Sequence, residues 1–406
     1  MEQSRLDVIK YPKDAYITLI EDKHIADQFF IILSGKVHII KEIQIASDGN
    51  DDTLGPGDFF GVISTMSGHR HIETAQAITD VSLIIVRRQQ FGCLIQNNAP
   101  VAIKIIVQFS KRMRYLDDTL AMYTTKRSVS IDVDNLYDVA VYYARQNRNN
   151  QAYYAYRQYI AYCPNGGNVQ AAREQLNKLA SRVKASKLSV NTSDMERFYP
   201  RDTMIFAQGE PGEEFFIIRG GSVKIVKIVK DSEVLLAILK PGDIFGEMAL
   251  LEFKPRGASA VAYEDCQLMV VTRANFDMMI KTQPQLISRL TTMLAERIWM
   301  VYRQLANARI NDPLGRIYDM LIVQLEKKRI NLQKKQECLL DFGTTELFEM
   351  VGLSQNGGST AFQKLMQNRY VKIIKGKICV TNVLEFYMHA SYYRKILDRK
   401  TTDNGK

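Results

Sequence analysis

Short apolar and β-branched runs recur in two separate parts of the chain, and Gly, Asp or Pro ends most of them. In the second part they cover residues 223–229, 234–239 and 266–271. Runs of this length between turn residues are typical of β-strands. The pattern predicts an α+β fold in which each part forms an antiparallel β-roll flanked by helices.

The two parts are copies of one domain. Three motifs are repeated: residues 11–14 at 199–202, residues 29–37 at 215–223, and residues 57–61 at 242–246. The offset between copies drifts only from 188 to 185 along these motifs, which indicates an internal duplication. We expect the copies at residues 6–120 and 196–311.

A helical insert, residues 121–195, separates the two copies. Its apolar and aromatic positions resemble the spacing of one tetratricopeptide (TPR-like) repeat: Leu136, Val139, Ala140, Tyr143, Ala152, Tyr156, Tyr159 and Pro164. One repeat cannot cover its own apolar face. We expect the insert to pack on a neighbouring β-roll or another subunit, and a groove for a protein partner is the alternative.

A long helix is predicted from Pro284 to about Ile310. Its apolar residues follow the 3,4,4,3,4,3 spacing of a two-stranded coiled coil: Ile287, Leu290, Leu294, Ile298, Val301, Leu305 and Ala308. This seam predicts a homodimer through residues 285–310. The alternative is a helix that lies on its own β-roll.

The last hundred residues have the pattern of a helix-turn-helix followed by a hairpin. After an amphipathic helix at 313–327, which Asp312 caps, a second helix with Thr344 as N-cap is followed by a third that Ser354 caps. The hairpin at 371–380 carries a basic tip. Residues 312–383 resemble a winged helix. This resemblance implies DNA contacts from Thr344, Gln355, Asn356, Thr360, Lys364, Lys375 and Lys377.

Two features depart from that resemblance. Phe348 stands where such motifs want a small residue, and Gly357-Gly358 lies inside the expected recognition helix, at about 1 kcal/mol per glycine relative to alanine. A winged helix that binds protein is therefore the alternative. The role of the extension at 384–406 is open.

The charge distribution and the spacing of the cysteines restrict which partners and cofactors are expected. Residues 309–406 contain 17 Lys plus Arg against 10 Asp plus Glu, which suits a polyanionic partner. The five cysteines form no pair at metal-ligand spacing, so we expect reduced thiols, no metal and no iron-sulfur cluster. No apolar leader or membrane-length run occurs, and we expect a cytoplasmic protein. Without a nucleophile-base pattern or Walker loop, an enzyme is not expected.

The stretch from residue 240 to 260 carries the main candidate site. Pro241-Gly242-Asp243 predicts a tight turn, after which residues 245–251 suit a short helix whose amides can approach an anion. Arg256 follows ten positions after Gly246. An arginine and a helix N-terminus would clamp a phosphate, and Glu247 could accept a hydrogen bond from a sugar hydroxyl. The alternative is a surface ion pair.

This stretch resembles the phosphate-binding cassette of cyclic-nucleotide-binding domains in catabolite-activator (CRP/FNR-type) regulators, with the pattern Phe-Gly-Glu-x-Ala-Leu and then Pro-Arg. The resemblance implies that Glu247 binds the ribose and Arg256 the cyclic phosphate. It implies a ligand-binding set of Gly246, Glu247, Met248, Ala249, Arg256, Gly257, Ala258, Val301 and Tyr302, in which the last two face the adenine. Gly257, in place of Thr or Ser, favours cyclic AMP (cAMP) over cyclic GMP (cGMP).

The first copy lacks the residues that carry this resemblance. Val62 replaces the glutamate and His71 the arginine; Arg70 and Glu73 are the nearest charged candidates. Losing a charged hydrogen bond costs about 2–3 kcal/mol. We expect this copy to bind cyclic nucleotides weakly or not at all.

Two functions remain open. The first is a cAMP-responsive, DNA-binding transcription regulator, in which the ligand shifts the winged helix toward a DNA-competent arrangement. The second is a cyclic-nucleotide-binding regulatory or scaffold protein that acts through protein partners. The segment Lys126-Arg127-Ser128 matches the inhibitor segment of such subunits poorly.

Overall fold

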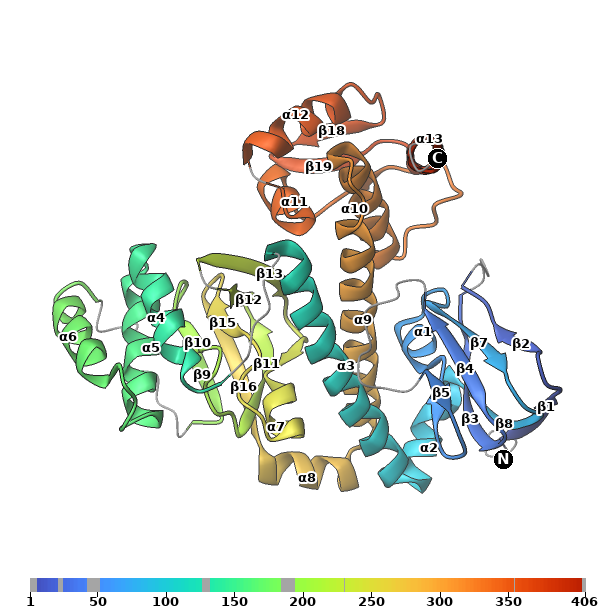
Figure 1. Cartoon of the computed structure of the whole chain (residues 1–406), viewed down its shortest axis with the longest axis horizontal. Helices are drawn as coiled ribbons and strands as arrows, with labels where there is room; N and C mark the ends of the chain where they lie inside the picture. The colour runs from blue at the N-terminus through green and yellow to red at the C-terminus, as the bar shows by residue number, and fades with distance from the viewer. Residues whose placement is uncertain are drawn as a thin grey trace. The chain divides into compact units, whose positions relative to one another are not determined.

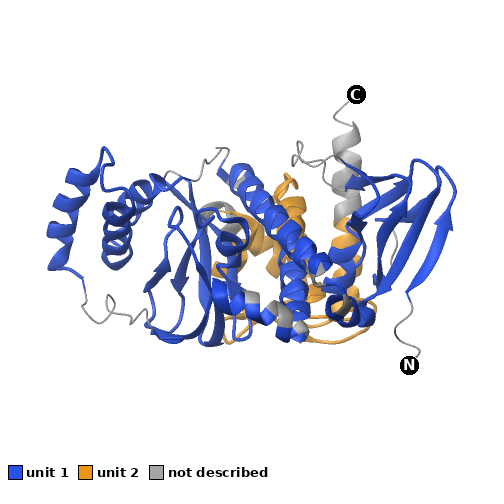
Figure 2. Ribbon diagram, turned by 90° about the horizontal axis from the view of Figure 1, so that it is seen from below, with its two compact units in different colours: residues 1–299 blue, residues 300–406 orange. Residues whose placement is uncertain are grey.

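The computed structural model describes residues 6–20, 25–41, 52–125, 132–183, 194–229, 231–353 and 355–403 (Figure 1). The chain divides into two compact units, residues 1–299 and 300–406 (Figure 2). The first unit holds both β-rolls and the helical insert.

The first β-roll consists of two antiparallel four-stranded sheets. Their orders are β1-β8-β3-β6 and β2-β7-β4-β5. The strands are β1 (Asp7–Tyr11), β2 (Tyr16–Thr18), β3 (Gln28–Ser34), β4 (Val37–Lys41), β5 (Thr53–Leu54), β6 (Phe59–Phe60), β7 (Glu73–Ala77) and β8 (Val81–Arg87). Alternate residues of the strands face inward, where Phe30, Val37, Ala75 and Leu83 form part of the core.

The second β-roll repeats this topology strand for strand. Its sheets have the orders β14-β11-β16-β9 and β10-β15-β12-β13. The strands are β9 (Glu196–Tyr199), β10 (Met204–Phe206), β11 (Glu214–Gly220), β12 (Val223–Val229), β13 (Ser232–Leu239), β14 (Ile244–Phe245), β15 (Ser259–Ala262) and β16 (Cys266–Thr272). The shared order confirms the duplication that the sequence repeats predict.

Helices connect and flank the two rolls. They are α1 (Val62–Ser67), the 3₁₀ turn η1 (Arg88–Gln90), α2 (Phe91–Asn97), α3 (Ala99–Thr125), α7 (Glu247–Glu252), α8 (Arg273–Thr282) and α9 (Pro284–Ala308). Although α3 follows the first roll in the chain, it packs on α7, β12 and β13 of the second (Figure 1).

The insert forms α4 (Asn135–Arg145), α5 (Asn149–Tyr162) and α6 (Val169–Ala180). Buried Tyr143, Tyr156 and Tyr159 share one apolar core with Met204 and Val226 of the second roll. The insert therefore covers its apolar face with the neighbouring β-roll, because a short helical hairpin exposes that face when isolated.

The second unit contains the C-terminal part of α9, a three-stranded sheet of order β17-β19-β18 and four further helices. Its elements after α9 are α10 (Pro313–Lys327), β17 (Cys338–Leu339), α11 (Thr344–Val351), α12 (Gln355–Met366), β18 (Val371–Ile374), β19 (Lys377–Val380) and α13 (Val383–Asp403). Asp312 caps α10 as expected: its carboxylate accepts from the Gly315 N–H at 2.6 Å.

Two local predictions for the helix pair need correction. Thr344 is the first residue of α11 and not its N-cap, which is Gly343; the Gly343 N–H donates to Glu346 at 3.1 Å. Phe348 is accommodated without a small residue, because its ring meets Phe362 edge-on at 5.9 Å. The α12 backbone is helical across Gly357-Gly358, and Ser354 lies outside the described residues.

In the described part of the chain, none of the helices combines the length and apolarity that a membrane crossing requires.

Candidate functional site

The cassette of the second roll begins where β14 ends. Gly246 has φ of +83°, and a Cβ on it would lie 2.7 Å from Nη1 of Arg256, so only glycine fits this position. Arg256 is 4% exposed; its Nη1 donates to the Gly246 carbonyl at 2.6 Å and its Cζ lies 4.2 Å from the centre of the Phe206 ring. The structure thus places Arg256 inside the cassette, beside the start of α7.

Glu247, the first residue of α7, is 1% exposed. Its Oε1 accepts a hydrogen bond from Nη1 of Arg297 on α9 at 2.8 Å. Sequence reasoning missed Arg297, which lies one helical turn before Val301 on the same helix. Val301 and Tyr302 belong to the second unit, and their role as adenine-facing residues stays a prediction.

Several buried polar atoms around the cassette lack a hydrogen-bond partner among the described residues. They are Nη2 of Arg114, Oδ1 of Asp117, Oε2 of Glu247, Nε of Arg256 and Nε of Arg297. Most buried polar groups in proteins are paired, and an unpaired one costs about 1–3 kcal/mol. A concentration of such atoms on α3, α7 and α9 therefore indicates a place where a polar ligand would gain hydrogen bonds.

Glu210 is a second buried carboxyl close to this arginine. It accepts from the Ala207 N–H at 2.9 Å and from the Tyr154 hydroxyl of α5 at 3.1 Å. Burial raises the pKa of Glu210 to about 7, although the charge of Arg256 acts in the opposite direction. Burial also lowers the pKa of Arg256 below its ordinary value. The helical insert therefore contacts Glu210, whose pKa depends on the charge of Arg256, the residue predicted to bind the phosphate.

Three more of the predicted ligand residues of the second roll are buried. Met248, Ala249 and Ala258 are each at most 8% exposed. The Gly257 carbonyl accepts from Nζ of Lys227 at 3.1 Å, and Lys227 also pairs with Asp118 of α3. The sequence patterns did not predict this contact between the second roll and Asp118 of α3.

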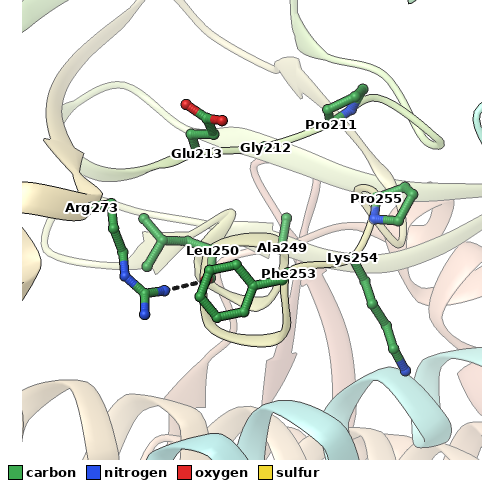
Figure 3. A pocket seen from close by; sticks show the side chains of 9 residues that line it. All are labelled: Pro211, Gly212, Glu213, Ala249, Leu250, Phe253, Lys254, Pro255 and Arg273. Atoms are coloured by element: carbon green, nitrogen blue, oxygen red, sulfur yellow. Dashed lines mark hydrogen bonds between the residues drawn. The ribbon is translucent and has the colours of Figure 1, made fainter.

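A pocket of about 470 Å³ lies next to the cassette (Figure 3). It is lined by Pro211, Gly212, Glu213, Ala249, Leu250, Phe253, Lys254, Pro255 and Arg273. Arg273 donates to the Leu250 carbonyl at 2.6 Å and lies over the Phe253 ring. Of the predicted ligand residues, Ala249 lines this pocket, whereas Glu247 and Arg256 do not.

In the first roll, the side chain of Glu73 occupies the start of the cassette, next to Gly61. Gly61, with φ of +77°, precedes α1 as Gly246 precedes α7. Its N–H donates to Oε1 of Glu73 at 3.1 Å, and Oε2 of Glu73 lies 3.6 Å from Nη2 of Arg112. A carboxylate of the chain thus binds the first amide of the cassette, and it would repel a phosphate there.

In the second unit, the predicted DNA-contacting residues that the structure describes are mostly exposed. Thr360 and Lys364 are exposed on α12, and Lys375 and Lys377 are exposed at the hairpin tip. Lys375 and Gly376 have φ of 49° and 76°, which closes the turn between β18 and β19. Thr344 is partly buried, and the side chains of Gln355 and Asn356 lie outside the described part.

Comparison with known proteins identifies the domains. Residues 8–98 and 196–283 each match the family model of the cyclic nucleotide-binding domain. Both matches end just before α3 and α9 begin. The chain therefore contains tandem cyclic nucleotide-binding domains, and it is homologous to regulators of the CRP/FNR type.

Two curated relatives show the extent of this homology. A CRP-like cAMP-activated global transcriptional regulator of Mycobacterium tuberculosis is 26% identical over 193 residues, which cover 47% of this chain and 86% of the relative. The cyclic AMP receptor protein of Thermus thermophilus is 37% identical over 103 residues, 25% of this chain and 48% of that protein. The first of these relatives is named as a transcriptional regulator and the second as a receptor.

Among solved structures, a CooA mutant from Carboxydothermus hydrogenoformans covers 51% of this chain and 90% of its own, with 16% identity and a TM-score of 0.42. A complex of CprK covers 47% of this chain and 87% of its own, with 19% identity and a TM-score of 0.40.

Proposed function

We propose that the protein is a transcription regulator that binds cAMP in its second roll and DNA through its C-terminal unit. The observation that carries the proposal is the position of Glu247 and Arg256 in the cassette. Both side chains are buried beside the N-terminus of α7, and each keeps one polar atom without a partner among the described residues. A cyclic phosphate and a ribose hydroxyl would supply the missing partners.

cAMP is the proposed ligand rather than cGMP because Gly257 follows Arg256 and offers no hydroxyl to a guanine. Val301 and Tyr302 are proposed to face the adenine. The names of the relatives support the same choice. The proposal includes no metal or iron-sulfur cluster, and it places the protein in the cytoplasm, where cAMP and DNA occur together.

The proposed ligand test is a calorimetric titration of the whole chain with cAMP and with cGMP. We expect one cAMP site per chain, because Glu73 already occupies the first amide of the other cassette. We expect cGMP to bind more weakly. Two equivalent cAMP sites would contradict the assignment of the first roll as a non-binding copy, and heat from neither nucleotide would contradict the proposed function.

The proposed DNA surface is a winged helix made of α11, α12 and the β18–β19 hairpin. Exposed Thr360 and Lys364 on α12 and the lysines at the hairpin tip support it. Amide side chains at Gln355 and Asn356 suit contacts with adenine in the major groove. The alternative function, control of a protein partner, needs no such basic surface.

Replacing both Lys375 and Lys377 with alanine is expected to weaken DNA binding for all sequences and to reduce its dependence on salt. Each phosphate contact contributes about 0.9 to the slope of log K against log salt concentration, so the double variant should lower the slope by about 2. Fluorescence anisotropy with genomic DNA fragments at several salt concentrations measures this.

The control is Lys10→Ala together with Lys13→Ala, which removes two exposed lysines from the first roll. If all proteins bind DNA alike, the hairpin is not a wing. If the wild type binds no DNA with or without cAMP, the result favours the alternative function, a regulatory protein that acts through protein partners.

The predicted homodimer through residues 285–310 gains no support from the fold. Ile287, Leu290, Leu294 and Ile298 are each at most 3% exposed in a single chain. Apolar side chains that are already covered gain little from a second copy. The homodimer through this helix therefore stays a prediction, as does the alternative of a helix that lies on its own β-roll. Likewise, the TPR-like face of the insert is occupied by the second roll, so a protein partner there stays a prediction.

A further inference from the structure

The loop between β10 and β11 of the second roll, residues 207–213, lies directly against Arg256. The Arg256 N–H donates to the Glu210 carbonyl at 2.8 Å, and the Gly209 N–H donates to the Arg256 carbonyl at 2.9 Å. A Cβ on Gly212 would lie 2.4 Å from Cζ of Arg256, so the guanidinium packs on the backbone of this loop. The position of the residue predicted to bind the phosphate therefore depends on the conformation of the loop.

The helical insert holds the other side of the same loop. Helix α5 packs on β10 (Figure 1), and its Tyr154 hydroxyl lies 3.1 Å from each carboxylate oxygen of Glu210. One helical turn later, Nε2 of Gln158 donates to Oε1 of Glu210 at 3.3 Å. A Cβ on Gly209 would lie 2.7 Å from the carbonyl oxygen of Asp132, in the segment that leads into α4. The loop is thus held between the insert and the cassette.

Glu210 is a buried carboxyl whose charge changes near neutral pH. It is 8% exposed, and burial raises its pKa from 4.5 to about 7. Burial and the charge of Glu210 raise the pKa of the Tyr154 hydroxyl well above its ordinary value, so this hydroxyl stays a donor while Glu210 titrates. The charged and titratable groups within electrostatic reach of the carboxyl are Arg256, Glu214 on β11, Tyr154 and Tyr162 on α5, and Tyr199 on β9.

The charge of Glu210 affects how strongly Arg256 can attract an anion. When Glu210 is protonated, the guanidinium can bind a phosphate without a competing carboxylate. When Glu210 is ionised, its negative charge attracts the guanidinium and repels the phosphate. The Tyr154 hydroxyl and the Gln158 amide donate to this carboxyl, and such hydrogen bonds favour its ionised form. Both residues of the insert therefore influence Arg256 through Glu210.

We propose that the helical insert sets the affinity of the second roll for its nucleotide, with Tyr154 and Gln158 as positioning residues that act on Arg256 through Glu210. The inference rests on the proposed function, in which Arg256 binds the cyclic phosphate. Helix α5 then weakens nucleotide binding above about pH 7, because it stabilises the ionised carboxylate. The insert is in this way a regulatory part of the ligand site as well as a support for the roll.

The test is a calorimetric titration of the whole chain with cAMP at several pH values, for wild type and Tyr154→Phe. We expect wild-type affinity to fall roughly five- to tenfold from about pH 6 to about pH 8.5, because a like charge beside the phosphate corresponds to about one pKa unit. Tyr154→Phe loses a donor that stabilises the ionised carboxylate, so this fall should move to higher pH. At about pH 7.5 the variant should bind cAMP roughly two- to threefold more tightly than wild type.

Two further variants make the result specific. The matched control is Tyr153→Phe, the same change at the neighbouring residue of α5, which also packs against the core of the insert. It should follow the wild-type pH profile. Glu210→Gln cannot ionise and should lose most of the fall in affinity. Titrations in two buffers of different ionisation enthalpy should also show that cAMP binding takes up fewer protons in Glu210→Gln than in wild type at about pH 7.

A Tyr154→Phe protein that binds cAMP more weakly at every pH, with an unshifted profile, would show that α5 only supports the fold. This result would overturn the inference. A Glu210→Gln profile equal to that of wild type would overturn it too, whether or not Tyr154→Phe folds. In both cases the nucleotide site stands, because the wild type binds cAMP. If the wild type binds cAMP at no pH, both the proposed function and this inference are overturned.

Discussion

Replacing Arg256 with alanine is expected to raise the Kd for cAMP by roughly ten- to a hundredfold, because a charged hydrogen bond contributes about 1.5–3 kcal/mol. Arg256 is 4% exposed, and its position is fixed by the Gly246 carbonyl and the Phe206 ring. A side chain that is held in place before the ligand arrives loses little entropy on binding. Isothermal titration calorimetry on the whole chain measures the change.

Two further variants make the interpretation specific. Arg256→Lys keeps the charge but loses the planar two-donor geometry, so it should fall between wild type and alanine. Arg219→Ala removes an exposed arginine from β11 of the same roll and should leave the Kd unchanged.

Since Arg256 is buried, each variant should also be checked for folding by circular dichroism. A folded Arg256→Ala protein with wild-type affinity would show that the anion binds elsewhere, for instance in the neighbouring 470 Å³ pocket.

The free energy of unfolding is expected to fall as the pH rises from about 4 to 7, because two buried carboxyls retain protons in the folded chain. Burial raises the pKa of Asp117 from 3.8 to about 7, and that of Glu210 from 4.5 to about 7. At a pH between the ordinary pKa and the raised pKa of each group, the unfolded chain has lost a proton that the folded chain still holds. Raising the pH in this range therefore favours unfolding. Above about pH 8 both groups are largely ionised in both states, and their contribution becomes constant.

The size of this effect follows from the shifts. One pKa unit corresponds to about 1.4 kcal/mol, so Asp117 contributes at most about 4.5 kcal/mol and Glu210 at most about 3.5 kcal/mol. Arg297, Lys227, Asp118 and Glu247 face Asp117 and already enter its shift. The double variant Asp117→Asn, Glu210→Gln should therefore be more stable than wild type at pH 8, and nearer to it at pH 4.

Urea denaturation at several pH values measures this difference, with Asp138→Asn as the control for an exposed carboxyl. Parallel stability curves for wild type and the double variant across pH 4 to 8 would show that neither carboxyl is protonated in the folded state.

The division of the chain into repeated domains could be predicted from the sequence. Turn motifs and apolar runs recur at a nearly constant offset, and each is a local signal that the strand order then repeats. The Asp312-Pro313 helix start was predictable for the same reason: a cap and the helix that it begins are adjacent in the chain. The cassette was found because its residues lie within twenty positions.

The partners of the cassette residues could not be predicted in this way. Arg114 and Glu252 are 138 positions apart, and Arg297 follows Glu247 by 50. No periodicity or turn pattern connects such residues, because their contact depends on where whole helices pack. The occupation of the first cassette by Glu73 likewise depends on a side-chain orientation, which the sequence does not specify.

The amino-acid sequence by itself determined two copies of one domain, with an anion-binding pattern intact in the second and lost in the first. Only the tertiary structure decided that α3 crosses to the other copy and brings Asp117 beside the residues of that pattern. The reason is physical: local patterns arise from interactions between neighbours in the chain, whereas helix packing is decided by which apolar and charged surfaces are buried together.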